Sequence, residues 1–355
     1  MSLSIQSVMD QRLSEYTPEQ CENGSSNDSI RLFLRSFFSV LPSEGQKKLA
    51  QDAVDCEDDG ALRQLVDSIR TGLIYPLRAA GGKTPGEVTP SPREGVEDSI
   101  EDLRSLIVLP ITRGVQSRLR DHCLERDGNR CTITRVYSFT HDPPSDVMSG
   151  TLQAAHIIPF TLGSYDQGNR DAEYRNSAIW INLRRYFPVL HAMSQDRQLI
   201  NHESNMLMLT LEAHAQFGAF RIVLEATSVI HQYHVHAFPN AARTPMRDVP
   251  ADGLIRLRNH TGRWPLPNPD LLRVHASIGH FLHMTGMAET LDKMLSDYDD
   301  CGGLAPSGST NVGELLALRG LSIITPNRPY AQSDEPSKAD PESSSRPENL
   351  RETSP

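Results

Sequence analysis

Apolar residues change their spacing along this chain, and that change limits the folds open to it. Residues 29–77 repeat apolar side chains at helical intervals, broken at Pro42 and near Gly60, which predicts three short helices. Between residues 131 and 238 the apolar residues come instead in short runs rich in β-branched and aromatic side chains, which are typical of strands. Both patterns in one chain predict an α+β protein.

The central region predicts a particular order of elements. A helix over 114–126 leads through the turn "DGNR" to a strand, "CTITRVYSF". The next elements predicted are a short extended segment (151–160), a helical excursion (176–193), a helix from about Thr210 to Gly218, a hairpin of two strands (219–226 and 232–238), and one or two helices over 268–297.

Composition divides the chain into six segments. Residues 79–98 are rich in Gly, Pro and Ser, as linkers are, and the chain from 326 is rich in Ser, Pro and Glu, as disordered tails are. We expect the following organisation: a disordered N-terminus (1–27), a helical region (28–78), the linker (79–98), a central domain (112–240), a helical extension (241–300) and a disordered tail (326–355).

Charge does not favour bulk attraction to nucleic acid. The net charge is −10, while residues 112–240 carry 12 basic and 12 acidic side chains. Every basic residue of that segment is Arg, which suits bidentate phosphate contacts, although Arg on solvated or salt-bridged faces explains the composition more simply. The charge pattern therefore leaves phosphate binding open and excludes a strongly basic DNA-binding domain.

The cysteines and the termini indicate an intracellular protein. Five cysteines are widely spaced and contain no CxxC pair, which argues against a disulfide framework or a Cys-rich zinc site. The sequence begins without an apolar signal core and contains no run long enough for a membrane span. We expect no membrane partner, and the sequence does not distinguish nucleus from cytoplasm or give the oligomeric state.

Three polar residues stand in apolar surroundings: His156 in "AAHIIPF", Asn205 in "SNMLML" and His214 in "LEAHAQFG". A lone His in an apolar strand is usually a buried structural residue, hydrogen-bonded through one nitrogen. The three together, in the order His, Asn, His, predict one site instead.

These segments resemble the HNH nucleases of the ββα-metal fold, and most closely the fungal subgroup of HNH-domain proteins. The resemblance rests on "CTIT" (131–134), "AHIIPF", "NMLML" and "HAQF", followed by a β-hairpin, and it spans roughly 126–238. It implies a ββα-metal core of about 115–240 between helical flanks and a disordered tail.

The resemblance also implies the chemistry. His156 takes the role of general base, because a neutral imidazole accepts a proton from water near neutral pH. His214 takes the role of metal ligand, for a divalent ion that is Mg²⁺, Mn²⁺ or Zn²⁺. Asn205 either completes the metal shell or holds backbone so that the strand presents its His correctly.

The metal site departs from the family pattern. Many members place Asp or His directly before the catalytic His, where this chain has Ala155, and some have a second His where this chain has Gly218. Glu212 and Gln216 lie two residues from His214 and so face other sides of a helix. Asp142, Asp146 or His141 of the loop "HDPPSD" could supply further ligands.

Other candidate ligands have simpler explanations. His234 and His236 share one face of a predicted strand, with His231 on the other face, and exposed hairpin positions explain them better than a metal does. Packing or exposure likewise explains the three histidines of the late helix, His275, His280 and His283, and Cys131 reads as a small core residue.

The reading favoured by these residues is a metal-dependent HNH endonuclease that hydrolyses phosphodiester bonds in DNA. The alternative is a catalytically inactive HNH-like module that binds nucleic acid, or binds a protein through its helical flanks. Ala155 and the neutral charge of the central segment favour the alternative.

Overall fold

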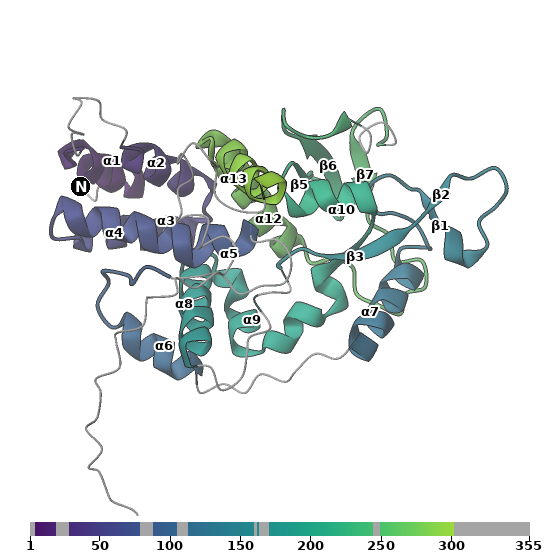
Figure 1. Ribbon diagram of the computed structural model, residues 1–355, viewed down its shortest axis with the longest axis horizontal. Helices are drawn as coiled ribbons and strands as arrows, with labels where there is room; N and C mark the ends of the chain where they lie inside the picture. The colour runs from purple at the N-terminus through teal and green to yellow at the C-terminus, as the bar shows by residue number, and fades with distance from the viewer. Residues whose placement is uncertain are drawn as a thin grey trace, which may run out of the picture. The chain divides into compact units, whose positions relative to one another are not determined.

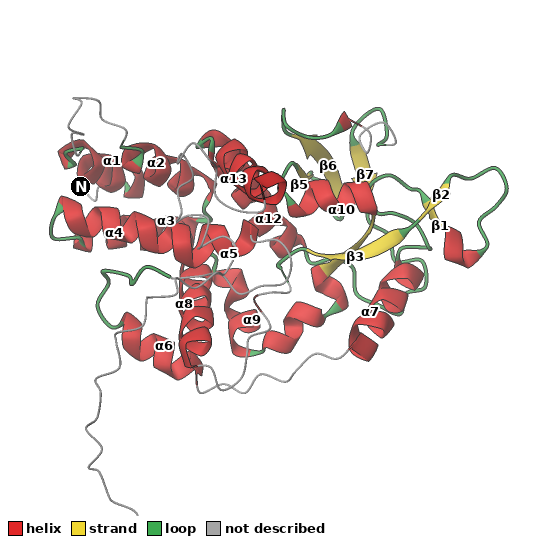
Figure 2. Ribbon diagram, in the orientation of Figure 1, coloured by secondary structure: helices red, strands yellow, loops and turns green. Residues whose placement is uncertain are grey.

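The computed structural model describes residues 4–18, 28–78, 88–104, 113–159, 162, 170–243 and 249–301. Helices and small sheets are both present, which confirms the predicted α+β class (Figures 1 and 2). The predicted tail over 326–355 lies outside the described residues. Among the described helices, none has the length and apolarity needed to cross a membrane.

The N-terminal helices follow the predicted pattern with one shifted boundary. The three helices expected over 29–77 are α2 (Ile30–Val40), α3 (Ser43–Asp55) and α4 (Asp59–Ile69). Pro42 precedes α3 as expected, but Gly60 lies inside α4, because the Asp58 side chain caps that helix by accepting from the Ala61 N–H. A π-helical turn (Arg70–Ile74) and α5 (Tyr75–Arg78) extend α4.

Two segments are more ordered than composition suggests. The expectation of disorder over 1–27 is wrong for Ile5–Glu15, which form α1 and bury Met9 and Leu13. The second half of the expected linker is also packed: Arg93 is buried and donates to Asn182 Oδ1 at 2.8 Å. It leads into α6 (Val96–Arg104), which the sequence reading missed.

The central region contains a strand, a second strand and a helix in close association. After α7 (Arg113–Arg126), β3 (Leu152–His156) pairs antiparallel with β4 (Met206–Thr210), and α10 (Leu211–Gly218) follows β4 without a loop. Figure 1 shows α10 beside β3. This is the ββα arrangement that the resemblance implies.

The prediction of a strand over 131–139 is mostly wrong. Residues 132–134 form a turn, and only β1 (Tyr137–Ser138) is extended, paired parallel with the equally short β2 (Ser149–Gly150). Arg135 adopts a positive φ of 64°, and the Cys131 N–H donates to the Val136 carbonyl. The β-branched residues of "CTIT" are buried in this tight turn and not in a ladder.

A helical insertion separates β3 from β4. It contains α8 (Arg170–Tyr186), a 3-10 turn (Pro188–Leu190) and α9 (His191–Gln195), in agreement with the excursion expected over 176–193. The buried indole of Trp180 donates to the Leu162 carbonyl at 2.9 Å, which ties α8 to the chain beyond β3. The insertion thus brings β4 back beside β3.

The C-terminal part adds a sheet and two helices. The predicted hairpin is β5 (Ile222–Ala226) and β6 (Gln232–Ala237), and β7 (Leu254–Arg256) extends it to three strands. The helices are α12 (Pro269–Met284) and α13 (Met287–Cys301), as predicted over 268–297. Phe281 of α12 packs edge-on against Phe33 and Phe37 of α2, so α12 joins the helical region to the sheet.

Candidate active site

His156 stands at the last position of β3. The antiparallel register places Leu152 opposite Thr210 and His156 opposite Met206, so His156 lies where β4 begins. Pro159 follows three residues later and cannot donate to a ladder, which ends the strand. The sequence "LQAAHIIP" therefore delivers an imidazole to the end of a strand.

The His156 ring is largely withdrawn from water. Burial lowers the pKa of His156 to about 4, with the Asn201 contact acting in the opposite direction and the His214 charge in the same direction. The Nε2 atom lies 3.4 Å from Asn201 Oδ1. The ring is therefore neutral at physiological pH, and a neutral imidazole keeps one unprotonated nitrogen, as a general base requires.

His214 is brought to the same strand by α10. The Thr210 hydroxyl caps α10 by accepting from the Ala213 N–H, so the helix begins directly where β4 ends. His214 Nδ1 lies 2.8 Å from Oε1 of Gln153, three residues before His156. Burial lowers the pKa of His214, as it lowers that of His156.

Asn205 holds the backbone between the two histidines. It is fully buried, and its Oδ1 accepts from the Ile158 N–H at 2.8 Å. Its Nδ2 donates to the carbonyls of Ile158 (3.0 Å) and Ile200 (2.9 Å). Of the two roles open to Asn205 in the sequence, this geometry supplies the backbone-holding one.

The structure offers few metal ligands at this site. His214 can offer Nε2 to an ion when Gln153 Oε1 accepts from its Nδ1–H, so Gln153 orients the ring and is not a ligand of that ion. A site of this kind fits Mg²⁺ or Mn²⁺, whose shells take few protein ligands and are completed by water and phosphate oxygens. Ala155 is buried opposite Leu207 and offers no donor.

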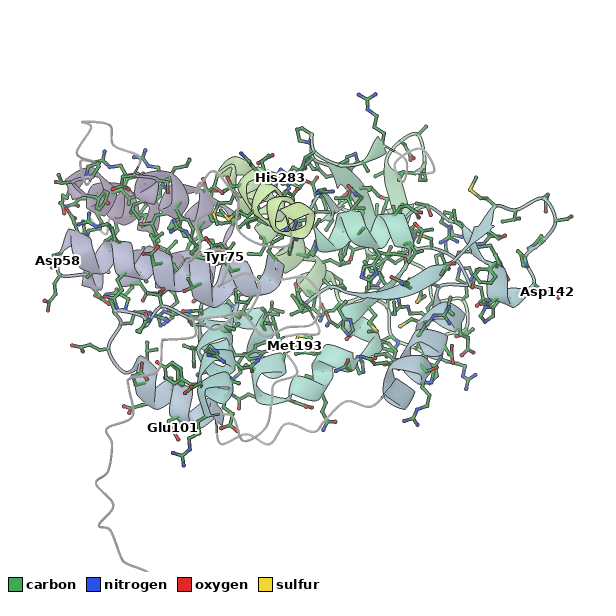
Figure 3. All side chains as sticks on the ribbon, in the orientation of Figure 1. Asp58, Tyr75, Glu101, Asp142, Met193 and His283 are labelled. Carbon is green, nitrogen blue, oxygen red and sulfur yellow. The ribbon has the colours of Figure 1, made fainter. Side chains whose placement is uncertain are left out.

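The other side chains considered as ligands have different surroundings. Glu212 is exposed, and Gln216 Oε1 accepts from the Ala242 N–H at 2.8 Å. His141, Asp142 and Asp146 are exposed on the loop between β1 and β2, and Figure 3 shows Asp142 at its outer end. In this structure the loop does not bring them to His214.

Arg126 and Asp127 fix α7 against this site. The buried Arg126 guanidinium pairs with both Asp127 oxygens, at 2.7 and 2.9 Å, and donates to the carbonyls of Glu203 and Met206. Asp127 also accepts from the Met208 N–H. The pair therefore positions the start of β4, opposite His156.

Several arginines of the central segment form ion pairs that stabilise the fold. Arg185 pairs with Asp52, and Arg221 pairs with Asp292. These two arginines are therefore salt-bridged, which is the simpler of the two explanations for a segment whose basic residues are all Arg. Arg120 of α7 contacts β3, with Nη2 3.3 Å from the Leu152 carbonyl, and its Nη1 lies 3.6 Å from Asp121 Oδ1.

Sequence reasoning missed Gln153, Asn201 and Arg126. Gln153 and His156 are an odd number of positions apart on one strand, so strand alternation alone does not pair them. Asn201 lies in a 3-10 turn (Arg197–Asn201), and its Nδ2 is buried without an acceptor among the described residues. The one sequence signal for Asn201 is the polar run "NHESN" directly before Met206, which indicates polar groups at the start of β4.

Comparison with known proteins gives a match to the segment that carries these residues. Residues 131–225 match the family model described as HNH endonuclease, a segment that includes His156, Asn205 and His214. Neither the curated proteins nor the solved structures contain a significant match to the chain. The predicted family is confirmed by this match: residues 131–225 form an HNH-family domain, with β3, β4 and α10 as its ββα unit.

Proposed function

We propose that the HNH-family domain is a metal-dependent endonuclease that hydrolyses phosphodiester bonds in DNA. One observation carries the proposal: β4 and α10 return His214, 58 positions later in the sequence, to the strand that ends in His156, where His214 Nδ1 lies 2.8 Å from Gln153 Oε1. A structural histidine in each element would not require this convergence.

The reaction assigned to His156 is proton transfer from water. The unprotonated ring nitrogen accepts the proton as the water oxygen bonds to phosphorus, and the bond from phosphorus to the 3′ oxygen breaks. The departing oxygen takes a proton from solvent. The low pKa makes His156 a weak base that is available throughout the neutral range.

His214 is the residue assigned to the divalent ion, and Gln153 is the partner that orients its ring. When bound, Mg²⁺ or Mn²⁺ supplies charge neutralisation at the phosphoryl group and the departing oxygen. Gln153 fixes the orientation of the His214 ring by accepting from Nδ1. With so few ligands from the protein, we expect weak affinity in the absence of substrate.

Asn205 and Asn201 act as positioning residues. Asn205 clamps the chain just after His156, and Asn201 contacts the His156 ring itself. The buried Nδ2 of Asn201 is satisfied best by a water molecule or a phosphate oxygen. Arg120, beside the start of β3, is the cation we assign to the DNA backbone.

The second candidate function is a binding module without catalysis. Its support is Ala155, whose buried methyl group offers no metal donor at the position directly before His156. Such a module would retain DNA on a column in a salt-sensitive way and would leave it uncut.

A plasmid nicking assay separates the two. Wild-type protein with Mn²⁺ or Mg²⁺ is expected to nick supercoiled plasmid, and His156→Ala to lower the rate by about 100-fold or more. His191→Ala, an exposed His on α9, is the matched control and should cut normally. Equal thermal unfolding of the variants establishes that they are folded. Cutting by His156→Ala at the wild-type rate would end the proposal.

A further inference from the structure

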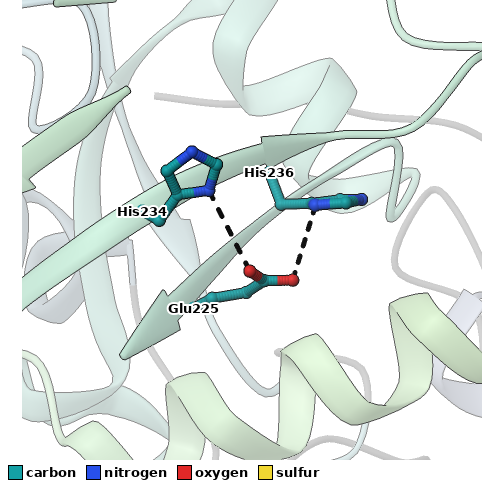
Figure 4. A group of neighbouring side chains, drawn as sticks. All are labelled: Glu225, His234 and His236. Carbon is teal, nitrogen blue, oxygen red and sulfur yellow. Dashed lines mark ion pairs between the residues drawn. The ribbon is translucent and has the colours of Figure 1, made fainter. Parts of the chain in front are cut away.

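A second group of histidines converges on one carboxylate in the C-terminal sheet, outside the site described above. Glu225 of β5 lies directly opposite His234 of β6, and His236 follows two residues along the same strand (Figure 4). Strand alternation places all three side chains on one face of the sheet. The shared face of His234 and His236 was predicted from the sequence, but the position of Glu225 beside them was not.

α12 adds a third imidazole to this group. The helix lies very close to β5 at Gly279, where an added Cβ would be 2.6 Å from the Val223 Cγ1 atom. Only a glycine permits this approach, and it places the next residue, His280, with its Nε2 atom 2.7 Å from Glu225 Oε1. The sequence favoured packing or exposure for His280, whereas the structure shows it in contact with the Glu225 carboxylate.

The donor atoms have the spacing of a metal site. His236 Nδ1 lies 3.5 Å from Glu225 Oε1, and His234 Nδ1 lies 3.9 Å from Oε2. Ligands about 2.0–2.1 Å from a tetrahedral ion are roughly 3.3–3.4 Å apart, so small side-chain rotations suffice. All three potential ligand atoms already lie within 4.8 Å of one another.

The chemistry of the donors selects the ion. Two imidazoles and one carboxylate suit Zn²⁺, whereas Mg²⁺ and Ca²⁺ prefer sites made mainly of oxygen ligands. The ligand side chains are 36–49% exposed, so ions reach them from solvent. Glu225 and His280 also line a cavity of about 490 Å³ between the sheet and α12, which keeps the carboxylate accessible.

We propose that Glu225, His234 and His236 bind a Zn²⁺ ion, with His280 as a positioning residue that donates to the Glu225 carboxylate. Three protein ligands leave the fourth tetrahedral position for water. The site is separate from His214 and does not depend on nuclease activity. It joins the β5–β6 hairpin to α12 through the His280 hydrogen bond.

The test is a Zn²⁺ titration of the full-length protein in competition with a chromophoric chelator at pH 7.5. The double variant His234→Ala/His236→Ala is expected to lose one Zn²⁺ per chain, while His214→Ala and the surface control His191→Ala retain it. Co²⁺ in place of Zn²⁺ should give the visible absorption of a tetrahedral ion in the wild type and not in the double variant. Thermal unfolding without metal establishes that each variant is folded.

His280→Ala distinguishes the positioning role from ligation. Loss of a hydrogen-bonding partner of a ligand typically weakens binding about 10- to 100-fold, so this variant should keep the site at reduced affinity. Unchanged affinity would remove His280 from the proposal. The same number of ions at the same affinity in wild type and double variant, or no Zn²⁺ bound by wild type, would overturn the site itself.

Discussion

His214 Nδ1 lies 2.8 Å from Gln153 Oε1, so the helix that follows β4 is joined to the strand that ends in His156. The partner of His214 Nδ1 is an uncharged amide, whereas a carboxylate at this position would make the imidazole a stronger metal ligand. The contact therefore gives a direct test of the proposed metal binding at His214.

Gln153→Glu should strengthen metal binding. A carboxylate beside His214 makes the imidazole a better donor and adds a negative charge at the ion, so we expect Mn²⁺ affinity to rise by about 10-fold or more. Gln153→Met, of similar volume, should lower it. Calorimetric titration measures the Mn²⁺ affinity of each variant. Equal affinity in the wild type, Gln153→Glu and Gln153→Met would show that the contact between Gln153 and His214 does not affect metal binding.

Asn205→Ala should destabilise the fold. The change leaves the Ile158 N–H and the carbonyls of Ile158 and Ile200 buried without their partner, which costs about 1–3 kcal/mol for each unsatisfied group that water does not reach. Urea unfolding should show a loss of at least about 2 kcal/mol. A variant of normal stability that fails to bind Mn²⁺ would instead identify Asn205 as a ligand.

Arg126→Met should be among the most destabilising changes in the chain. It leaves Asp127 as a buried charge without its cation, a loss of about 3–5 kcal/mol in the free energy of unfolding. Arg273→Met is the matched control, because that side chain is 65% exposed and its pair with Asp270 contributes less than about 1 kcal/mol. Similar losses in the two variants would contradict the role given to the buried pair.

Acid should destabilise the protein through His275. This ring is stacked on Phe217 at 3.8 Å, and burial lowers the pKa of His275 to about 3. The folded pKa lies below the unfolded value of about 6.5, so the unfolded chain binds the proton first as pH falls. The stability from the neutral ring is complete above about pH 6.5 and decreases toward pH 3, by up to about 1.4 kcal/mol per pH unit.

His275→Phe removes that proton-binding group. Its free energy of unfolding should be somewhat lower at pH 8, because the hydrogen bond to the Phe217 carbonyl is lost, and should fall less steeply between pH 6.5 and 4. Urea unfolding at several pH values checks both. Parallel pH profiles for the two proteins would show that His275 does not carry the acid sensitivity.

Most of the local elements and the HNH family were predictable from short sequence patterns. Helical spacing predicted α2, α3 and α4, alternation predicted the β5–β6 hairpin, and the segments around His156, Asn205 and His214 indicated the HNH family that the match over 131–225 confirms. These features succeed because they depend on neighbours within about four positions along the chain. The burial of α1 and the turn at "CTIT" were missed because they depend on packing.

The meeting of side chains that lie far apart in the sequence depends on the packing of the whole fold. The antiparallel register of β3 and β4, followed directly by α10, brought Gln153 to His214 and gave Asn205 its backbone partners. The close approach of α12 at Gly279 brought His280 to Glu225. Such contacts arise from strand register and helix docking, which are set by the whole core, and no local pattern in one sequence encodes them.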